Sequence, residues 1–258
     1  MRRGELWMAE AFYCDVLGFT VLAKPDPHAS RGGRWFACGA VQLHLGVDES
    51  FRPTPTSPPD RAAASLRDRR YRVGVHILFL CTGNAIRSPL AQGLVTAVAR
   101  RDGLAITASS AGTLAGERPI DPAVTRWLGD LGILLAAHRS HVVSVDDVTA
   151  CSVVVGMARA HVRHAVALSP PAWTRAFTLK ELVRQAGPVG PRAASEPVGR
   201  WLDRVGAGRQ PSAMLGDARA DDVTDPLGAP ARAMDQTLQE VAGLVQELVT
   251  LLAPPRTT

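Results

Sequence analysis

Long apolar runs are absent from this sequence of 258 residues, although 46% of them are hydrophobic. No stretch approaches the ~18 apolar residues that a membrane-spanning helix needs. Glu5 and Glu10 interrupt the N-terminal segment, which argues against a secretory signal. We therefore expect a globular, cytoplasmic protein without membrane contact, long enough for one large domain or for one domain and a smaller piece.

Cysteine and lysine are both scarce. The cysteines are Cys14, Cys38, Cys81 and Cys151. They are scattered and form no CxxC pair, so neither a disulfide framework nor a metal site is predicted, and we expect reduced thiols. Lysine occurs only at positions 24 and 180, so arginine supplies nearly all of the positive charge behind the net charge of +5. No basic run interleaved with aromatic residues appears, and nucleic-acid binding is not predicted.

Proline and polar residues break the chain after residue 53, where "RPTPTSPPD" disfavours both helix and central strand. We predict a small fragment over residues 1–53, a linker over 54–73 and a main domain over 74–253. In the fragment, the spacing predicts a helix over 9–17 and then three strands in "TVLAK", "RWFAC" and "VQLHLGV", which makes a small α+β unit.

After the break, strands and helices alternate. "VHILFL" (75–80), "LAITASSAGT" and "CSVVVGM" read as strands, and the segment 88–100, "DPAVTRWLGDLGI", "RAHVRHAVAL", "LKELVRQ", "SEPVGRWLDRVG" and the segment 231–252 read as helices. Such alternation predicts an α/β fold, with a central parallel sheet between two layers of helices. Ligands of this architecture bind at the carboxyl ends of the strands, and the first strand ends on "CTGNAIRSP" (81–89).

The loop "CTGNAIRSP" has the composition of an anion site. Small and turn-forming residues that lead into a helix direct backbone N–H groups at one point, with the positive end of the helix dipole behind them. The lysine that ends a nucleotide-binding loop is missing, and Arg87 supplies the charge instead. A cysteine thiol ionises readily beside an arginine and a helix N-terminus. Cys81 is therefore a candidate nucleophile, although a lone cysteine can also be a small buried residue that ends a strand.

The rest of the loop supports the same interpretation. Ser88 can donate a hydrogen bond to the Cys81 thiolate, and Asn84 tolerates the left-handed backbone that a tight loop needs. The residues predicted to bind the substrate, mainly through backbone N–H groups, are Thr82, Gly83, Asn84, Ala85, Ile86 and Ser88.

Residues 75–252 resemble the low-molecular-weight protein tyrosine phosphatases. The family signature is Cys, five residues, Arg and Ser after the first strand, as in "ILFLCTGNAIRSPLAQGL". The segments that follow in the family's order are "SSAGT", "PIDPAV", "HRSHVVSVDDV", "GMARAH", "RAFTLKEL" and "DDVTDPLG". The resemblance implies a flavodoxin-like three-layer sandwich and hydrolysis of phosphotyrosine proteins or small phosphate monoesters through a phosphocysteine on Cys81, without metal or cofactor.

The same resemblance assigns the general acid to Asp225, the aspartate of the family's Asp-Pro pair. Expelling a phenolate calls for a proton at the leaving oxygen, which a carboxylic acid can supply. Asp222 is the local competitor and lacks the following proline. The family's second cysteine is replaced by Ile86, and Leu227 stands where an aromatic residue often follows the pair. A tryptophan common in the loop "TLAGERP" is also missing, so the wall around a phosphotyrosine ring is less complete than the phosphate site.

Two other functions fit parts of this pattern. Arsenate reductases share the fold and loop but use further cysteines, whereas position 88 is serine and Cys151 begins a strand. A phosphate-binding module without activity is the second alternative. His161 and His164 lie three apart on a predicted helix and are read as surface or packing residues rather than metal ligands.

Residues 9–53 resemble part of a glyoxalase and bleomycin-resistance (vicinal oxygen chelate) module, in "FYCDVLGF", "RGGRWFACGAVQLHLGV" and "FRP". The resemblance covers roughly half of what such proteins use, and their metal ligands come from two modules. His44 and Glu49 therefore cannot make a metal site alone, and His44 is read as an ordinary strand residue.

Overall fold

The computed structural model describes residues 14, 20–24, 33–38, 41–46, 74–135 and 138–253, which fall into two compact units. The smaller unit takes the described residues up to position 46 together with 209–215, and the larger unit takes the others. The predicted linker 54–73 and, apart from Cys14, the helix predicted at 9–17 lie outside the described residues.

The smaller unit holds an antiparallel sheet in the order β1-β2-β3. Its elements are β1 (Thr20–Leu22), β2 (Gly33–Cys38), β3 (Val41–Gly46) and the short 3-10 helix η4 (Pro211–Met214). The three strands predicted from alternation are thus confirmed. His44 lies opposite Trp35, and the two rings stack with their centroids 3.6 Å apart, a packing role that suits an ordinary strand residue. Glu49 lies outside the described residues.

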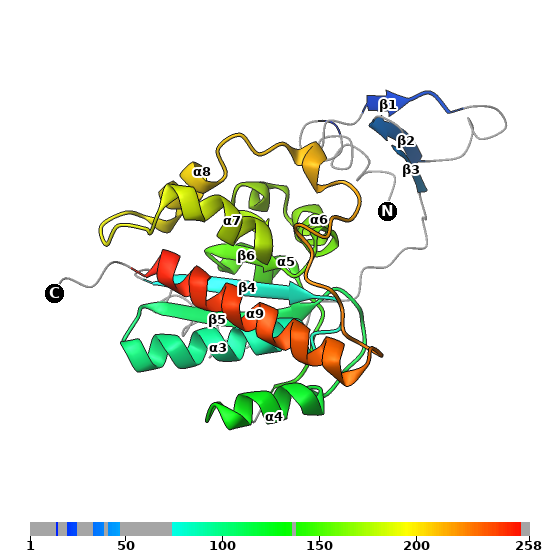
Figure 1. The fold of residues 1–258 in the computed structure, drawn as a ribbon. Helices are drawn as coiled ribbons and strands as arrows, with labels where there is room; N and C mark the ends of the chain where they lie inside the picture. The colour runs from blue at the N-terminus through cyan, green and yellow to red at the C-terminus, as the bar shows by residue number, and fades with distance from the viewer. Residues whose placement is uncertain are drawn as a thin grey trace. The chain divides into compact units, whose positions relative to one another are not determined.

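The larger unit is the predicted α/β domain, a four-stranded parallel sheet in the order β5-β4-β6-β7 with helices around it (Figure 1). Its elements are β4 (Val75–Cys81), α3 (Arg87–Asp102), β5 (Ile106–Gly112), α4 (Pro122–Asp130), α5 (Val145–Ala150), β6 (Val153–Gly156), α6 (Arg159–Leu168), η3 (Pro170–Arg175), β7 (Ala176–Thr178), α7 (Leu179–Val189), α8 (Val198–Val205) and α9 (Ala231–Leu252). None of the helices in the described ranges combines the length and apolar character that crossing a membrane requires.

Strand β4 determines where the site lies. All seven of its residues are buried, as expected for a parallel strand covered on both faces. It pairs with β5 on one side and with β6 on the other. The chain therefore adds β5 at one side of β4 and then β6 and β7 at the other side. Right-handed crossovers then place helices on both faces, with α9 packed against α3 and α7. The carboxyl end of β4 is therefore the switch point where ligands of such folds bind.

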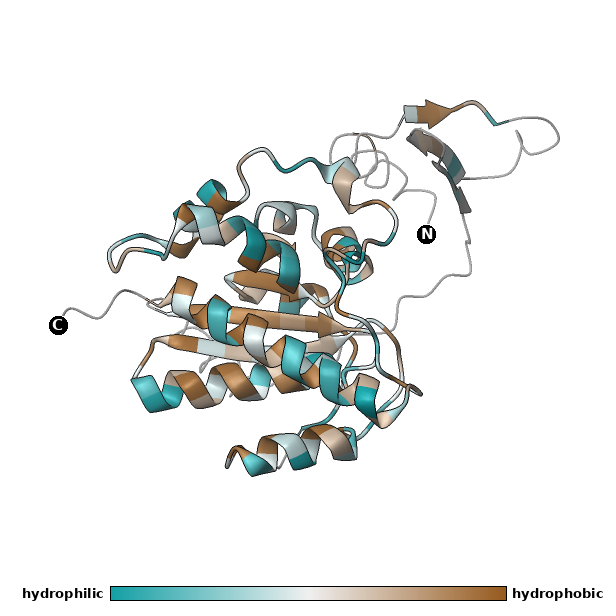
Figure 2. Ribbon diagram, in the orientation of Figure 1, coloured by the Kyte–Doolittle hydropathy of each residue, from teal (hydrophilic) through white to brown (hydrophobic). Residues whose placement is uncertain are grey.

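The helix ends follow from local chemistry. Helix α3 begins at Arg87 with Pro89 in its first turn, where a missing N–H is harmless, and Gly103 ends it with a left-handed φ of 64°. Asp121 caps α4 as predicted, because its carboxylate accepts from the N–H of Ala123 at 2.8 Å. Helix α9 has the predicted bounds, and Figure 2 shows it banded in polar and apolar residues.

Among the strands and α-helices, two elements escape prediction because they are short. Strand β7 has three residues, too few to show a period, and α5 has six. Helix α8 buries Trp201, whose indole N–H donates to the Gly190 carbonyl at 3.0 Å. That contact holds α8 against the end of α7.

Candidate active site

Cys81 ends β4 and lies at the floor of a hollow of about 80 Å³. Its Sγ accepts two hydrogen bonds, one from the backbone N–H of Asn84 at 3.2 Å and one from the Ser88 hydroxyl at 3.0 Å. Both donors are fully buried. The sulfur is therefore held by two fixed donors, and Ser88 makes the contact predicted for it.

The loop after Cys81 carries further donors. The backbone N–H groups of Gly83, Ala85 and Ile86 meet no acceptor within the described part of the chain, and these three residues line the hollow. N–H groups at the start of a helix, with the helix dipole behind them, bind anions. The loop therefore has the donors that an oxyanion site needs.

Asn84 holds the shape of the loop. Its φ is 50°, and it is the one non-glycine residue with positive φ among the described residues, as the tight turn predicted. Its amide donates to Ser88 Oγ at 3.0 Å and to Ser110 Oγ at 2.9 Å, and its Oδ1 accepts from the His141 N–H at 3.3 Å. His138 Nε2 lies 2.9 Å from the Asn84 carbonyl. Together with the bond from its own N–H to Cys81, the residue is thus held by five partners.

A glycine in β5 makes room for the loop. A Cβ at Gly112 would lie 2.9 Å from the Thr82 carbonyl oxygen and 3.2 Å from the Asn84 Cβ. The first contact is with backbone, which a side-chain rotation cannot relieve. The glycine of "SSAGT" is therefore explained by close approach to the phosphate loop.

Arg87 connects the loop to a distant segment. It is buried, and its guanidinium donates to the Val223 carbonyl at 3.0 Å and to Thr82 Oγ1 at 3.3 Å. The same guanidinium pairs with the Asp225 carboxylate. A buried planar cation at the wall of the hollow is placed to hold two oxygens of a tetrahedral anion.

The structure separates Asp225 from its competitor. Asp225 lines the hollow and remains partly exposed, with 42% of its side chain accessible. Asp222 instead accepts from the backbone N–H groups of Arg159 at 2.7 Å and Ala218 at 3.0 Å. Asp222 is thus a structural residue of the loop that presents Asp225.

Three further residues line the hollow. Leu227 stands where the family's aromatic residue was expected and is 74% exposed, whereas Leu114 and Arg118 were not identified by the sequence pattern. His161 touches the loop from behind, with Nε2 at 3.1 Å from Thr82 Oγ1. It is 4% exposed, so of the two predicted roles only packing fits, and that packing is against the site. Its position in "GMARAH" was the available signal.

Histidine charge states around the loop differ. Burial, with a smaller contribution from Arg87, lowers the pKa of His161 to about 3. Burial also lowers the pKa of His138. The hydrogen bond to Asp147 raises the pKa of His141, and the pKa of Asp147 falls to about 2 despite burial. The imidazole beside Thr82 is therefore neutral at physiological pH.

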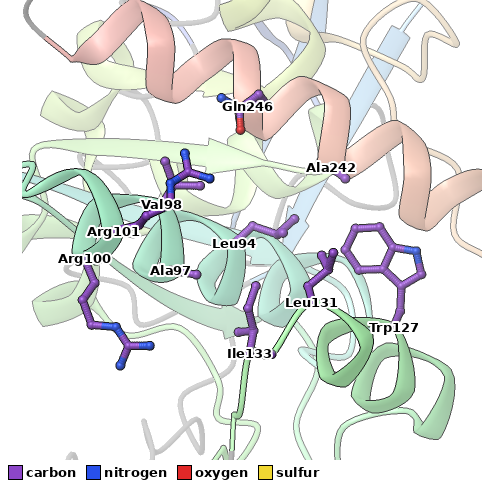
Figure 3. Close-up of a pocket in the computed structure, with 11 residues that line it drawn as sticks. Leu94, Ala97, Val98, Arg100, Arg101, Trp127, Leu131, Ile133, Ala242 and Gln246 are labelled. Atoms are coloured by element: carbon purple, nitrogen blue, oxygen red, sulfur yellow. The ribbon is translucent and has the colours of Figure 1, made fainter. Parts of the chain in front are cut away.

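A larger cavity lies elsewhere in the described part of the chain. A cavity of about 730 Å³ lies between α3, α4 and α9, where Leu94, Val98, Trp127, Leu131 and Ala242 face it (Figure 3). None of the predicted site residues lines it. The small hollow is the better candidate because it alone contains the nucleophile, the cation and the acid found by the sequence.

All the predicted site residues meet at this one place. Cys81, Thr82, Gly83, Ala85, Ile86, Arg87 and Asp225 line the hollow, and Asn84 and Ser88 lie buried behind the loop. Cys151 is not among the lining residues. It is buried at the end of α5, with its Sγ 3.3 Å from the Arg175 guanidinium.

Comparisons with known proteins agree with the fold and the loop. A family model described as low molecular weight phosphotyrosine protein phosphatase matches residues 76–189. A protein-arginine-phosphatase of Bacillus subtilis is 32% identical over 108 residues, which cover 42% of this chain and 71% of the relative.

Solved structures match the larger unit. A low molecular weight protein tyrosine phosphatase from T. tengcongensis superposes with a TM-score of 0.51 and 28% identity, over 68% of this chain and 98% of that one. The YwlE arginine phosphatase, in a cysteine-to-serine mutant with a phosphorylated active-site serine, gives a TM-score of 0.50 and 26% identity, over 67% of this chain and 93% of that one.

Proposed function

This chain belongs to the low molecular weight phosphotyrosine protein phosphatase family, which confirms the family and enzyme class predicted from its sequence, and we propose that it hydrolyses phosphate monoesters through a phosphocysteine on Cys81. One observation carries the proposal. Cys81, held by two donors, shares a hollow of about 80 Å³ with Arg87 and Asp225.

In the first step, the Cys81 sulfur bonds to phosphorus while the bond from phosphorus to the leaving oxygen breaks. The Asp225 carboxyl gives its proton to that oxygen, so that a neutral alcohol or phenol departs. Arg87 and the loop N–H groups hold the equatorial oxygens, over which negative charge is spread in the transition state. The phosphorylated serine in the mutant relative supports such a phosphoryl-enzyme intermediate.

In the second step, water attacks phosphorus and the sulfur–phosphorus bond breaks. The Asp225 carboxylate now takes the proton of the water, and inorganic phosphate leaves while the thiolate is regenerated. The Ser88 hydroxyl, 3.0 Å from the sulfur, stabilises the departing thiolate. No further reactant is required, because the two steps together only add water to the ester.

Hydrolysis of p-nitrophenyl phosphate between pH 5 and 7 tests the proposal. Cys81→Ser should reduce the rate to background. Asp225→Asn should lower kcat by about 10²–10⁴-fold for phenyl phosphate, whose leaving group is poor, and by less for p-nitrophenyl phosphate. Asp217→Asn is the matched control, since that side chain is 87% exposed and outside the hollow. An inactive wild type, or full activity in Cys81→Ser, would refute the proposal.

Phosphoarginine is a second candidate substrate beside phosphotyrosine. The B. subtilis relative is an arginine phosphatase, and the rim of the hollow carries the aliphatic side chains Leu114 and Leu227 rather than aromatic rings. Competition between phosphotyrosine and phosphoarginine peptides of one sequence, measured as a ratio of kcat/KM, decides between them. Arsenate reduction that depends on Cys151 would instead favour the reductase alternative.

For the rest of the chain we propose the predicted organisation: a fragment over 1–53 derived from a vicinal-oxygen-chelate-like module, a linker over 54–73 and the phosphatase domain over 74–253. A cytoplasmic location suits an enzyme that needs a reduced thiol at Cys81. Deleting residues 1–60 should leave the kcat for p-nitrophenyl phosphate within about twofold. A larger loss would mean that the fragment takes part in the activity.

A further inference from the structure

His161 is in contact with the phosphate loop although no step of the proposed reaction uses it. It lies in the first turn of α6 and is 4% exposed. Its Nε2 is 3.1 Å from Thr82 Oγ1, and the same hydroxyl oxygen accepts from the Arg87 guanidinium at 3.3 Å. Thr82 itself lines the hollow. Two buried side chains therefore converge on one hydroxyl at the edge of the site.

The ring of His161 carries a single N–H at neutral pH, because burial and Arg87 lower its pKa to about 3. Its other nitrogen, Nδ1, is buried and has no hydrogen-bond partner among the described residues. Two arrangements are possible. Either the Thr82 hydroxyl donates to Nε2 and the N–H is at Nδ1, or Nε2–H donates to the hydroxyl and Nδ1 is unprotonated.

The two arrangements present different charges to the hollow. In both, the buried Nδ1 has no partner among the described residues, so the difference lies at Thr82. In the first, the Thr82 hydrogen is directed at His161 and points away from the site of a bound anion. In the second, Arg87 and His161 both donate to Thr82 Oγ1, which can accept two hydrogen bonds, and the hydroxyl hydrogen is left to point into the hollow. Only the second leaves the Thr82 hydroxyl hydrogen available to a phosphoryl oxygen.

We infer that His161 is a positioning residue that donates from Nε2 to Thr82, so that the Thr82 hydroxyl becomes an additional donor to a phosphoryl oxygen. The inference rests on the proposed function, since it assumes that phosphate occupies the hollow. It adds a side-chain donor to a site otherwise built from Arg87 and backbone N–H groups. It also assigns a reason for a neutral, buried histidine at this position.

Binding of inorganic phosphate, measured by isothermal titration calorimetry at pH 7, tests the inference without turnover. Thr82→Val keeps the branched shape, removes the donor and should weaken binding about tenfold. His161→Leu should weaken it several-fold, and His161→Gln, whose amide can donate from a similar place, should restore part of the loss. His164→Leu is the matched control and should stay within about twofold, since His164 is on the same helix but, among the described residues, neither lines the hollow nor hydrogen-bonds to the loop.

A double variant separates positioning from general damage. Since His161 acts through the hydroxyl, His161→Leu should weaken phosphate binding by no more than about twofold in a protein that already carries Thr82→Val. Additive losses would overturn the inference. An unchanged phosphate affinity in Thr82→Val would also overturn the inference. If that variant still hydrolysed p-nitrophenyl phosphate, the proposed function would be unaffected.

The tautomer can be read in the unmodified protein, which removes any concern about folding of the variants. Long-range ¹H–¹⁵N NMR spectra of the phosphate-bound protein, assigned with His161→Gln, report which ring nitrogen carries hydrogen. We expect hydrogen on Nε2, and hydrogen on Nδ1 would overturn the inference. A wild type that neither binds phosphate nor hydrolyses p-nitrophenyl phosphate would refute the proposed function and this inference with it.

Discussion

Replacing Asn84 tests how the phosphate loop keeps its shape. Its side chain makes three hydrogen bonds, to Ser88, Ser110 and the His141 N–H, at 2.9–3.3 Å. At about 1 kcal/mol net for each bond, Asn84→Gly should lower the free energy of unfolding by roughly 3 kcal/mol. Asn84→Ala loses the same bonds and must also adopt a φ of 50°, which adds about 1 kcal/mol.

Urea unfolding of the two variants and the wild type provides the measurement. Both variants should remain folded, because a domain of this size has about 5–15 kcal/mol of stability. Each should also lose at least about tenfold in kcat/KM, since the Ser88 hydroxyl and the loop N–H groups are no longer held in place. Equal stability of the Ala and Gly variants would refute the argument from φ. Losses below about 1 kcal/mol in both would refute the argument from the hydrogen bonds.

Three further predictions concern other parts of the site. Gly112→Ala should lower kcat/KM by about 10²-fold, because the new Cβ must displace backbone 2.9 Å away, and a loss under about threefold would contradict this. Peroxide should inactivate the enzyme at Cys81 without forming a disulfide, because Ile86 occupies the position of the family's second thiol. Complete recovery of activity with added thiol, traced by mass spectrometry to a disulfide at Cys81, would contradict this prediction. Below about pH 6.5 His161 takes up a proton in the unfolded protein, whereas in the folded protein its ring stays neutral to about pH 3. The wild type should therefore lose stability relative to His161→Gln as the pH falls, by about 1.4 kcal/mol per pH unit between about pH 6 and 4. A constant stability difference between the two proteins over that range would refute the assigned charge state.

Much of the domain could be predicted because its signals are local. The run of apolar residues in β4, the cap at Asp121 and the amphipathic pattern of α9 each depend on residues close together in the chain. The short elements could not be found in this way, since the three residues of β7 are too few to show a period. Their structure comes from pairing with β6, a contact between distant segments.

The sequence by itself determined the chemistry of the loop. Cys81, Arg87 and Ser88 are joined by one short turn, so their spacing alone brings them to the same anion site. The choice of Asp225 over Asp222 required the resemblance to a family. Only the tertiary structure shows the physical difference, because the Asp225 carboxylate lines the hollow and pairs with Arg87, whereas the Asp222 carboxylate accepts hydrogen bonds from backbone N–H groups.

Tertiary structure alone decided the role of His161. In the sequence it is one of two histidines on a helix, far from the loop, and its place in "GMARAH" does not say what it contacts. The phosphate loop follows β4 and α6 follows β6, and these two strands are parallel neighbours. Their carboxyl ends meet at one edge of the sheet, so the start of α6 lies beside the loop. Spacing along a chain fixes which groups share a turn, whereas contacts between turns depend on the order of the strands.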